Sequence, residues 1–343
     1  MNAPLQPRFL DLSPQKYPTL SVVIPVYNER DVLPLCYSRL RDVLAPLDLH
    51  YELVFVDDGS SDGSADYLAD LARVTPAVKV IRLSRNFGKE AAMTAGIAQT
   101  AGDAVVVLDA DLQDPPELIP DMLTAWHEGA DVVCMRRRSR GGETRLKRAS
   151  AHLFYRLLNR ISTVPIPKDT GDFRLLSRRA VDALAQLPER NRYMKGLFAW
   201  IGMPTRVLEY DRAPRAIGNS KWGYLGLMHL AFEGITSFSV APLRWATALG
   251  FIAATSGSLF GVWIVIKTVF LGEAVQGYPS LMAIMTFLGG IQLLTIGLLG
   301  EYVGKIYLET KQRPLYLIRD VIDNRQTTVQ SSDIKEHKLY AAK

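Results

Sequence analysis

Short apolar runs alternate with segments of helical periodicity along the N-terminal part of the chain. The runs at residues 20–26, 51–56, 78–83, 104–108 and 131–135 are rich in β-branched residues and end at polar turns, as strands do. The segments at 32–44, 66–74, 89–100 and 118–127 carry apolar residues at the spacing of an amphipathic helix. This alternation predicts an α/β fold with a largely parallel sheet covered on both faces, in which ligands bind at the carboxyl ends of the strands.

Two longer apolar runs follow toward the C-terminus. Residues 245–266 and 278–300 contain no Asp, Glu, Lys or Arg, and each exceeds the roughly 18 uncharged residues that indicate a spanning helix. A pair of buried core helices is the alternative. Because only residues 267–277 separate the runs, we predict a two-helix transmembrane hairpin at 241–307, with spans at about 243–267 and 278–302.

Basic residues flank the predicted hairpin on its two outer sides. They are Arg212, Arg215, Lys221 and Arg244 before it, and Lys305, Lys311, Arg313 and Arg319 after it. The connecting loop has a single basic residue, Lys267. The positive-inside rule therefore predicts an inner (plasma) membrane protein whose N-terminal domain and both termini are cytosolic. Residues 1–19, which lack the apolar core of a signal peptide, and residues 308–343 are predicted to be a flexible N-terminal tail and a cytosolic C-terminal tail.

Two further segments are predicted to lie at the membrane interface, within a domain that spans 20–240. Residues 144–161 repeat apolar positions at helical spacing among arginines and lysines, and a helix packed on the sheet is the alternative. Residues 224–240 lead into the first span. The formal net charge is only +5, and its clustering near these segments favours a membrane surface or a phosphate ligand over nucleic acid. Cys36 and Cys134 fit no metal or disulfide pattern and are predicted to be free, buried thiols.

Two carboxylates, Asp109 and Asp111, directly follow the strand predicted at 104–108. Alternate residues of an extended chain point to the same side, so both can face one ion. Oxygen ligands of this kind suit Mg²⁺ or Mn²⁺ bound together with substrate phosphates, and Gln113 lies in the turn that follows. The alternative is that these aspartates only stabilise a turn.

Other polar residues follow the first three strands. An aromatic ring and an acid, Tyr27 and Glu29, come after the first strand, and Asp57 and Asp58 end the second. A ring can stack on a nucleobase, and carboxylates can accept hydrogen bonds from a base or a ribose, although the second pair could also serve only a turn and a helix cap. Lys89 starts a helix, where a phosphate would be favoured. The absence of Walker and Gly-x-Gly-x-x-Gly motifs argues against a kinase or a dinucleotide enzyme.

In this order, the motifs resemble family 2 of the inverting glycosyltransferases, which have the GT-A (Rossmann-like) nucleotide-sugar fold. The resemblance covers residues 19–240. The motifs at 169–176, 191–196 and 218–222, together with the hairpin, are similar to the polyprenyl-phosphate type. Within that type the chain most resembles bactoprenol (undecaprenyl) phosphate glucosyltransferases of O-antigen modification, which are related to dolichol-phosphate mannose synthases.

The resemblance implies roles for particular residues. It implies a nucleoside site at Pro25, Tyr27, Glu29, Asp57 and Asp58, and a metal and diphosphate site at Asp109, Asp111 and Gln113. It implies acceptor-phosphate contacts from Arg136, Arg138, Arg140, Ser220 and Lys221, although each basic residue could instead be a solvated surface charge. Asp172 matches an acceptor-side carboxylate, which is either a general base or a group that orients Arg174.

The implied reaction is a metal-dependent, inverting transfer of a sugar to undecaprenyl phosphate at the cytosolic membrane face, for cell-envelope glycan or lipid modification. UDP-glucose is the expected donor, and GDP-mannose or a UDP-amino-arabinose derivative is the alternative. A processive polysaccharide synthase is less favoured because residues 241–245 lack the Gln of Gln-x-x-Arg-Trp. The intact acidic motifs disfavour a non-catalytic membrane scaffold. The oligomeric state, a homo-oligomer included, is left open.

Overall fold

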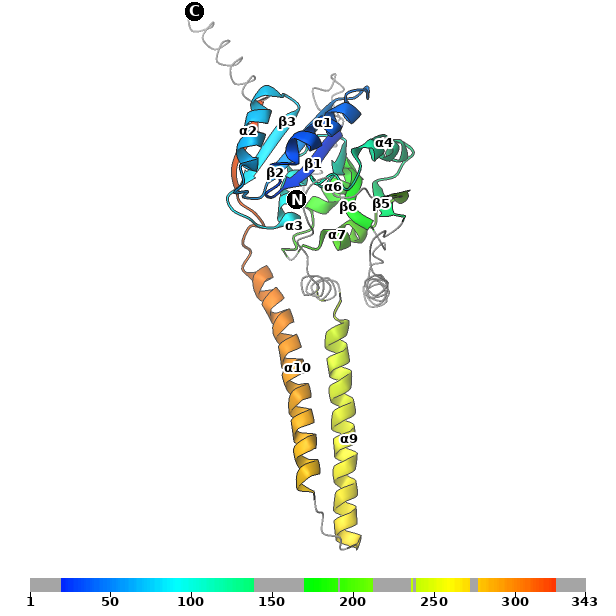
Figure 1. The fold of residues 1–343 in the computed structure, drawn as a ribbon. Coiled ribbons are helices and arrows are strands. Elements are labelled where there is room, and N and C mark those ends of the chain that lie inside the picture. Colours follow the sequence, from blue (N-terminus) through cyan, green and yellow to red (C-terminus); the bar gives the residue numbers. More distant parts are fainter. Residues whose placement is uncertain are drawn as a thin grey trace, which may run out of the picture.

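The structure is a computed structural model that describes residues 20–138, 170–190, 192–211, 236, 239–271 and 277–324. Its centre is an eight-stranded mixed sheet with the order β7-β5-β6-β4-β1-β2-β3-β8 (Figure 1). The strands are β1 Leu20–Val26, β2 Tyr51–Asp57, β3 Val78–Leu83, β4 Ala104–Val107, β5 Val132–Arg137, β6 Thr170–Ser177, β7 Thr205–Tyr210 and β8 Ile318–Asp323. Four of the seven pairings are parallel, and those of β6 with β4 and β5 and of β8 with β3 are antiparallel.

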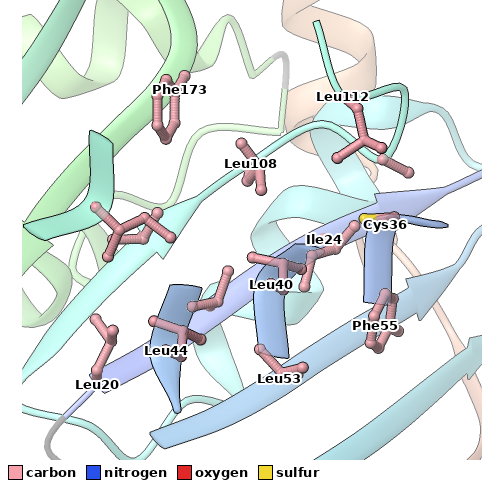
Figure 2. Packing of buried hydrophobic residues seen from close by; sticks show 14 of the residues in the cluster. Leu20, Ile24, Cys36, Leu40, Leu44, Leu53, Phe55, Leu108, Leu112 and Phe173 are labelled. Carbon is pink, nitrogen blue, oxygen red and sulfur yellow. The ribbon is translucent and has the colours of Figure 1, made fainter. Parts of the chain in front are cut away.

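Helices cover both faces of the sheet. The side chains of the central strands are therefore buried on both faces. The helices are α1 Leu33–Leu44, α2 Ser64–Val74, α3 Lys89–Ala98, the short 3₁₀ helix η1 Pro116–Leu118, α4 Ile119–His127, α6 Arg178–Ala185 and α7 Met194–Trp200. One core cluster lies between the sheet and α1, α2 and α4, and Figure 2 shows Ile24, Leu40 and Phe55 within it. The other cluster joins the opposite face to α3, α6 and α7. These two layers confirm the expected α/β fold class.

Most strands of the sheet end on the same side, which we call the carboxyl edge to distinguish it from the outermost strands β7 and β8. The parallel strands β1 to β4 end there, and β5 and β7 run in the same direction. The antiparallel strand β6 begins at this edge, because Val107 of β4 pairs with Arg174. Asp172 therefore extends beyond the end of β4, beside Asp109.

The strand β8 corrects the prediction that residues 308–343 form a tail. Residues 318–323 pair with β3 at the edge of the sheet, and Ile322 packs against the core. Half of its residues, Arg319, Asp320 and Asp323, are charged, as is common in edge strands. The segment therefore has too little hydrophobicity for the sequence to distinguish it from a polar tail.

Two long helices, α9 Ala241–Leu271 and α10 Tyr278–Thr310, lie side by side and extend away from the sheet (Figure 1). Both are long and apolar enough to cross a membrane, and the apolar stretches that qualify are not buried in the protein. The predicted spans at about 243–267 and 278–302 lie within them. The N-terminal tail at 1–19, the interfacial helix at 144–161 and all but residues 236, 239 and 240 of the segment at 224–240 lie outside the described residues.

The glycine at position 96 allows α3 to lie directly on β1 and β2. A Cβ atom there would meet Val23 Cγ1 at 2.4 Å and Val56 Cγ2 at 2.9 Å, and both valines are fully buried. Replacing a helical glycine by alanine ordinarily stabilises a protein by roughly 0.5–1 kcal/mol. Here overpacking, which costs roughly 1–3 kcal/mol, opposes that gain.

We therefore expect Gly96→Ala to lower the midpoint of thermal unfolding, measured in detergent. The control is Gly257→Ala, at a helical glycine where a Cβ meets no atom within 4 Å. A Gly96→Ala protein as stable as the control would show that the close packing of α3 is unimportant.

Candidate active site

The loops that follow β1 and β2 are joined by a series of hydrogen bonds. The backbone of Asn28 is left-handed, with φ of 54°, and its side-chain oxygen accepts from Ser61 N at 2.8 Å. In the other direction, Asn28 N donates to Ser60 Oγ at 3.0 Å and Glu29 N to Ser64 Oγ at 3.1 Å. Tyr27, just before these contacts, is 43% exposed, so its ring is available for stacking at the edge of the sheet.

The buried carboxylate of Asp58 holds the loop after β3. Its oxygens accept from Phe87 N at 2.7 Å and Gly88 N at 2.9 Å. Burial raises the pKa of Asp58, although the two amides partly oppose this effect. Gly59 allows the loops to approach, because a Cβ there would lie 2.7 Å from the carbonyl carbon of Arg85. Asp58 thus organises the start of α3, and its predicted contact with a nucleoside, like those of Pro25, Glu29 and Asp57, stays a prediction.

A single ammonium group bridges two acids at the centre of this edge. Lys89 Nζ lies 2.7 Å from Asp109 Oδ1 and 2.7 Å from Asp172 Oδ2. The two side chains are 22% and 13% exposed, and Asp172 Oδ1 is buried without a hydrogen-bond partner in the described part of the chain. From its place at the start of a helix, Lys89 is predicted to bind a phosphate. The structure adds an ion-pair role that spacing could not reveal.

Asp172 is held in its ionised form. Burial raises its pKa, but the positive charges of Lys89, Lys195 and Arg174 outweigh that effect and place the pKa well below the ordinary value. Among the described residues, Asp172 and Arg174 share no hydrogen bond or ion pair, and the predicted role of Asp172 in orienting Arg174 stays a prediction. The Arg174 guanidinium donates to Gly171 O at 2.8 Å and stacks on the Phe198 ring, 3.9 Å from its centroid. The cation that Asp172 contacts directly is Lys89.

The fit of a divalent metal rests on Asp109 and Asp111. Asp111 is 8% exposed, and its Oδ1 accepts from Gln113 N at 3.1 Å across a turn in which Leu112 has φ of 57°. No group of three or more His, Cys, Asp or Glu suited to a metal occurs among the described residues. Magnesium is commonly held by one or two carboxylates plus substrate phosphates, so this pair fits such an ion. Their role as ligands stays a prediction, as does that of Gln113.

The two cysteines are free and buried, as predicted. Burial, and then the charge of Asp111, raise the pKa of the Cys36 thiol to about 12. Because the thiolate is the reactive and metal-binding form, this shift disfavours a chemical role for Cys36.

The described members of the predicted acceptor cluster are paired with acids. Arg136 of β5 forms an ion pair with Glu209 of β7, its partner in the parallel register. Arg138 lies 3.3 Å from Asp211 Oδ2. The other predicted members, Arg140, Ser220 and Lys221, lie outside the described residues. The described arginines are thus charge-balanced at the carboxyl ends of β5 and β7.

Comparison with known proteins gives this arrangement a family. The family model described as glycosyl transferase family 2 matches residues 21–185. A bactoprenol glucosyl transferase of Shigella phage SfX is 47% identical over 300 residues, which are 88% of this chain and 98% of that protein. The chain belongs to glycosyl transferase family 2.

Two further relatives cover the same share of this family 2 glycosyltransferase. An uncharacterised glycosyltransferase of Synechocystis, sll0501, is 48% identical over 302 residues, 88% of this chain and 95% of that protein. A prophage bactoprenol glucosyl transferase homolog of Escherichia coli K12 is 44% identical over 302 residues, 88% of this chain and 99% of that protein. The predicted family and the predicted enzyme class are thereby confirmed.

Glu90 of the glycosyltransferase has a position in the site that the sequence did not predict. Its Oε2 accepts from Met194 N at 3.2 Å, so it links the start of α3 to the start of α7. Burial and the charge of Asp172 raise its pKa to about 7, against the opposing effects of Lys89 and Lys195. In the sequence, Glu90 is an acid next to Lys89, and Met194 lies in the motif at 191–196. Only the fold brings these two residues together.

We expect Glu90→Gln to reduce the pH dependence of stability. The carboxyl titrates near its ordinary value of 4.5 in the unfolded chain and near 7 in the folded protein. The folded state therefore binds the proton more tightly, and the stability from this site is present below about pH 4.5 and lost as pH rises through about 7. Melting temperatures from pH 4.5 to 8 should fall less steeply for Glu90→Gln than for wild type. The control is the exposed Glu117→Gln, and a wild-type slope in Glu90→Gln would contradict the prediction.

Proposed function

We propose that this glycosyltransferase transfers glucose from UDP-glucose to undecaprenyl phosphate, with inversion at the anomeric carbon, at the cytosolic face of the bacterial inner membrane. The product would be a polyprenyl-phosphate sugar for cell-envelope glycan or lipid modification. Relatives with the name bactoprenol glucosyl transferase, 44–47% identical along nearly their whole length, support the sugar and the acceptor.

The observation that carries the proposal is the attachment of the two apolar helices beside the acidic edge of the sheet. Arg190 N, in the loop before α7, donates to Glu309 Oε1 at the end of α10 at 2.7 Å. Only residues 311–317 separate the end of α10 from β8, which starts where β3 ends. A lipid acceptor with its isoprenoid chain in the membrane would therefore present its phosphate at the edge that contains Asp109 and Asp172.

The donor side is supported by the loops after β1 and β2 and by the acidic pair after β4. Tyr27 would stack on the base, and Pro25, Glu29, Asp57 and Asp58 would shape the nucleoside site. Mg²⁺ or Mn²⁺, held by Asp109 and Asp111 with Gln113, would supply Lewis-acid stabilisation of the departing diphosphate. Lys89 pairs with the Asp109 carboxylate and so fixes it just beyond the end of β4.

The acceptor needs alignment more than it needs a base. A phosphate monoester with a second pKa near 6 is mostly ionised at neutral pH. Asp172, whose pKa is held low by nearby cations, is a poor proton acceptor. We therefore assign it the role of fixing Lys89 and shaping the acceptor side. The cations Arg136, Arg138, Arg140 and Lys221, with Ser220, would draw in the acceptor phosphate against the repulsion of the donor diphosphate.

The membrane topology is part of the same proposal. The connecting loop of the hairpin has one basic residue and the flanks have several, so the positive-inside rule places the sheet on the cytosolic side. Protease digestion of inside-out and right-side-out vesicles distinguishes the orientations, since only inside-out vesicles should expose the domain.

The test is a product assay in which the purified full chain is incubated with undecaprenyl phosphate, Mg²⁺ and a panel of UDP-glucose, GDP-mannose and a UDP-amino-arabinose derivative. We expect lipid-linked glucose from UDP-glucose alone. Asp111→Ala should keep the wild-type melting temperature and lose more than nine-tenths of the turnover, because it would remove a metal ligand. The control is Asp121→Ala, an exposed acid at the start of α4. A variant that keeps more than a tenth of the turnover at saturating Mg²⁺ would exclude Asp111 as a ligand.

Asp172→Asn separates positioning from general-base catalysis. Removal of an obligatory base would cost on the order of 10²–10⁴-fold, and an acceptor already ionised by raised pH would relieve that loss. We expect a lowered turnover that does not recover selectively between about pH 6 and 8, because the variant lacks the charge that holds Lys89. Rates of wild type and variant are compared at fixed metal and saturating donor. Recovery of most of the activity only at high pH would identify Asp172 as the base.

A further inference from the structure

Lys195, at the start of α7, has no role in the proposal so far, and it has no direct partner among the described residues. Several other described cations of this edge already have direct partners: Lys89 contacts two aspartates, Arg174 contacts Gly171 and Phe198, Arg136 contacts Glu209, and Arg138 contacts Asp211. Within the described part of the chain, Lys195 makes no hydrogen bond or ion pair, although its charge acts on both Asp172 and Glu90.

The backbone around Lys195 is firmly positioned. Lys195 is the second residue of α7, and the helix has no side-chain cap of its own. Glu90 of α3 supplies one, since it accepts from Met194 N, and Met194 is fully buried against α3 and α6. One turn later, Phe198 lies under Arg174. The start of α7 is thus held from both α3 and β6, and Lys195, at its second position, is half-buried.

The position of α7 favours the acceptor side over the donor side. The donor acids Asp109 and Asp111 follow β4, and Lys89 stands between them and Asp172. Lys195 belongs to the helix whose preceding loop is bonded to the end of α10 through Arg190 and Glu309. In Figure 1, α7 lies on the side of the sheet from which the two long helices extend.

We propose that Lys195 binds the phosphate of the lipid acceptor and holds it beside Asp172, with Glu90 positioning α7 for this contact. The inference rests on the proposed function and adds a residue to its acceptor site. A phosphate monoester has three oxygens that accept charge-assisted hydrogen bonds. An ammonium group without another partner can donate to one of them while Lys89 keeps the two carboxylates in place.

The test measures KM separately for undecaprenyl phosphate and for UDP-glucose, with the full chain in detergent. Lys195→Gln should raise KM for undecaprenyl phosphate by about 10-fold or more, the usual worth of a charged hydrogen bond. KM for UDP-glucose should stay within about twofold. Lys195→Arg, which retains the charge, should recover most of the loss. The matched control is Lys311→Gln, an exposed lysine just after α10, which should leave both constants unchanged.

Two results would overturn the inference while the wild-type enzyme remains active. One is an unchanged KM for undecaprenyl phosphate in Lys195→Gln. The other is a selective rise in KM for UDP-glucose, which would assign the lysine to the donor diphosphate. A wild-type enzyme with no transfer to undecaprenyl phosphate would instead overturn the proposed function, and the inference with it. If Lys195→Gln also lowers the melting temperature and Lys195→Arg does not restore KM for undecaprenyl phosphate, the role of Lys195 is structural, and this would overturn the inference as well.

Discussion

The ammonium group of Lys89 allows two carboxylates from different strands to share one edge of the sheet. Asp109 follows β4, and Asp172 belongs to the antiparallel strand β6, so the register places them next to each other. Two ionised acids this close repel each other, and the usual result is that one of them becomes protonated. A cation within 2.7 Å of each removes that penalty. Asp172 stays ionised, which keeps Lys89 in place beside Asp109.

The position of Lys89 depends in turn on how α3 meets the sheet. Its first turn is set by the loop that Asp58 binds through two backbone amides. Its depth is set at Gly96, where the helix lies against Val23 and Val56. Neither interaction involves a substrate. Buried backbone bonds and close packing thus fix the start of α3, and with it the backbone of Lys89, at the ends of the strands.

The sequence predicted this fold where a local pattern carries the information. The bounds expected for β1 and β3 agree with the structure, because their apolar runs are continuous and end at polar turns. The order of Tyr27, Asp57 and Asp109 along the chain indicated the common edge, since parallel strands bring their carboxyl ends together. What the sequence could not show depends on pairing across long distances. The strand β8 is only partly apolar, and its place beside β3 follows from where α10 ends.

The same limit applies to the site. The partner of Asp172 is 83 positions away in the chain, and the nearer Arg174 points instead to Gly171 and Phe198. Glu90 has a charged neighbour in the sequence, but its contact with Met194 spans 104 positions. Local spacing names residues of the right chemical type. Which of them face each other is decided by strand register and helix packing.

The topology also constrains how the domain can meet a membrane. The two long helices stand in the chain between β7 and β8, which are the opposite edges of the sheet. The chain therefore leaves the sheet from one edge strand and returns to it as the other. Tyr302 and Lys305 of α10 are bonded to Ser239 and Thr236, just before α9 begins. On the α10 side only residues 311–317 separate the helix from β8, and Arg190 N donates to Glu309 Oε1, which restricts how far the domain can swing. If the helices span the membrane as proposed, the edge with Asp109 and Asp172 keeps a constant height above it, which suits a substrate whose phosphate is confined to the surface of the bilayer.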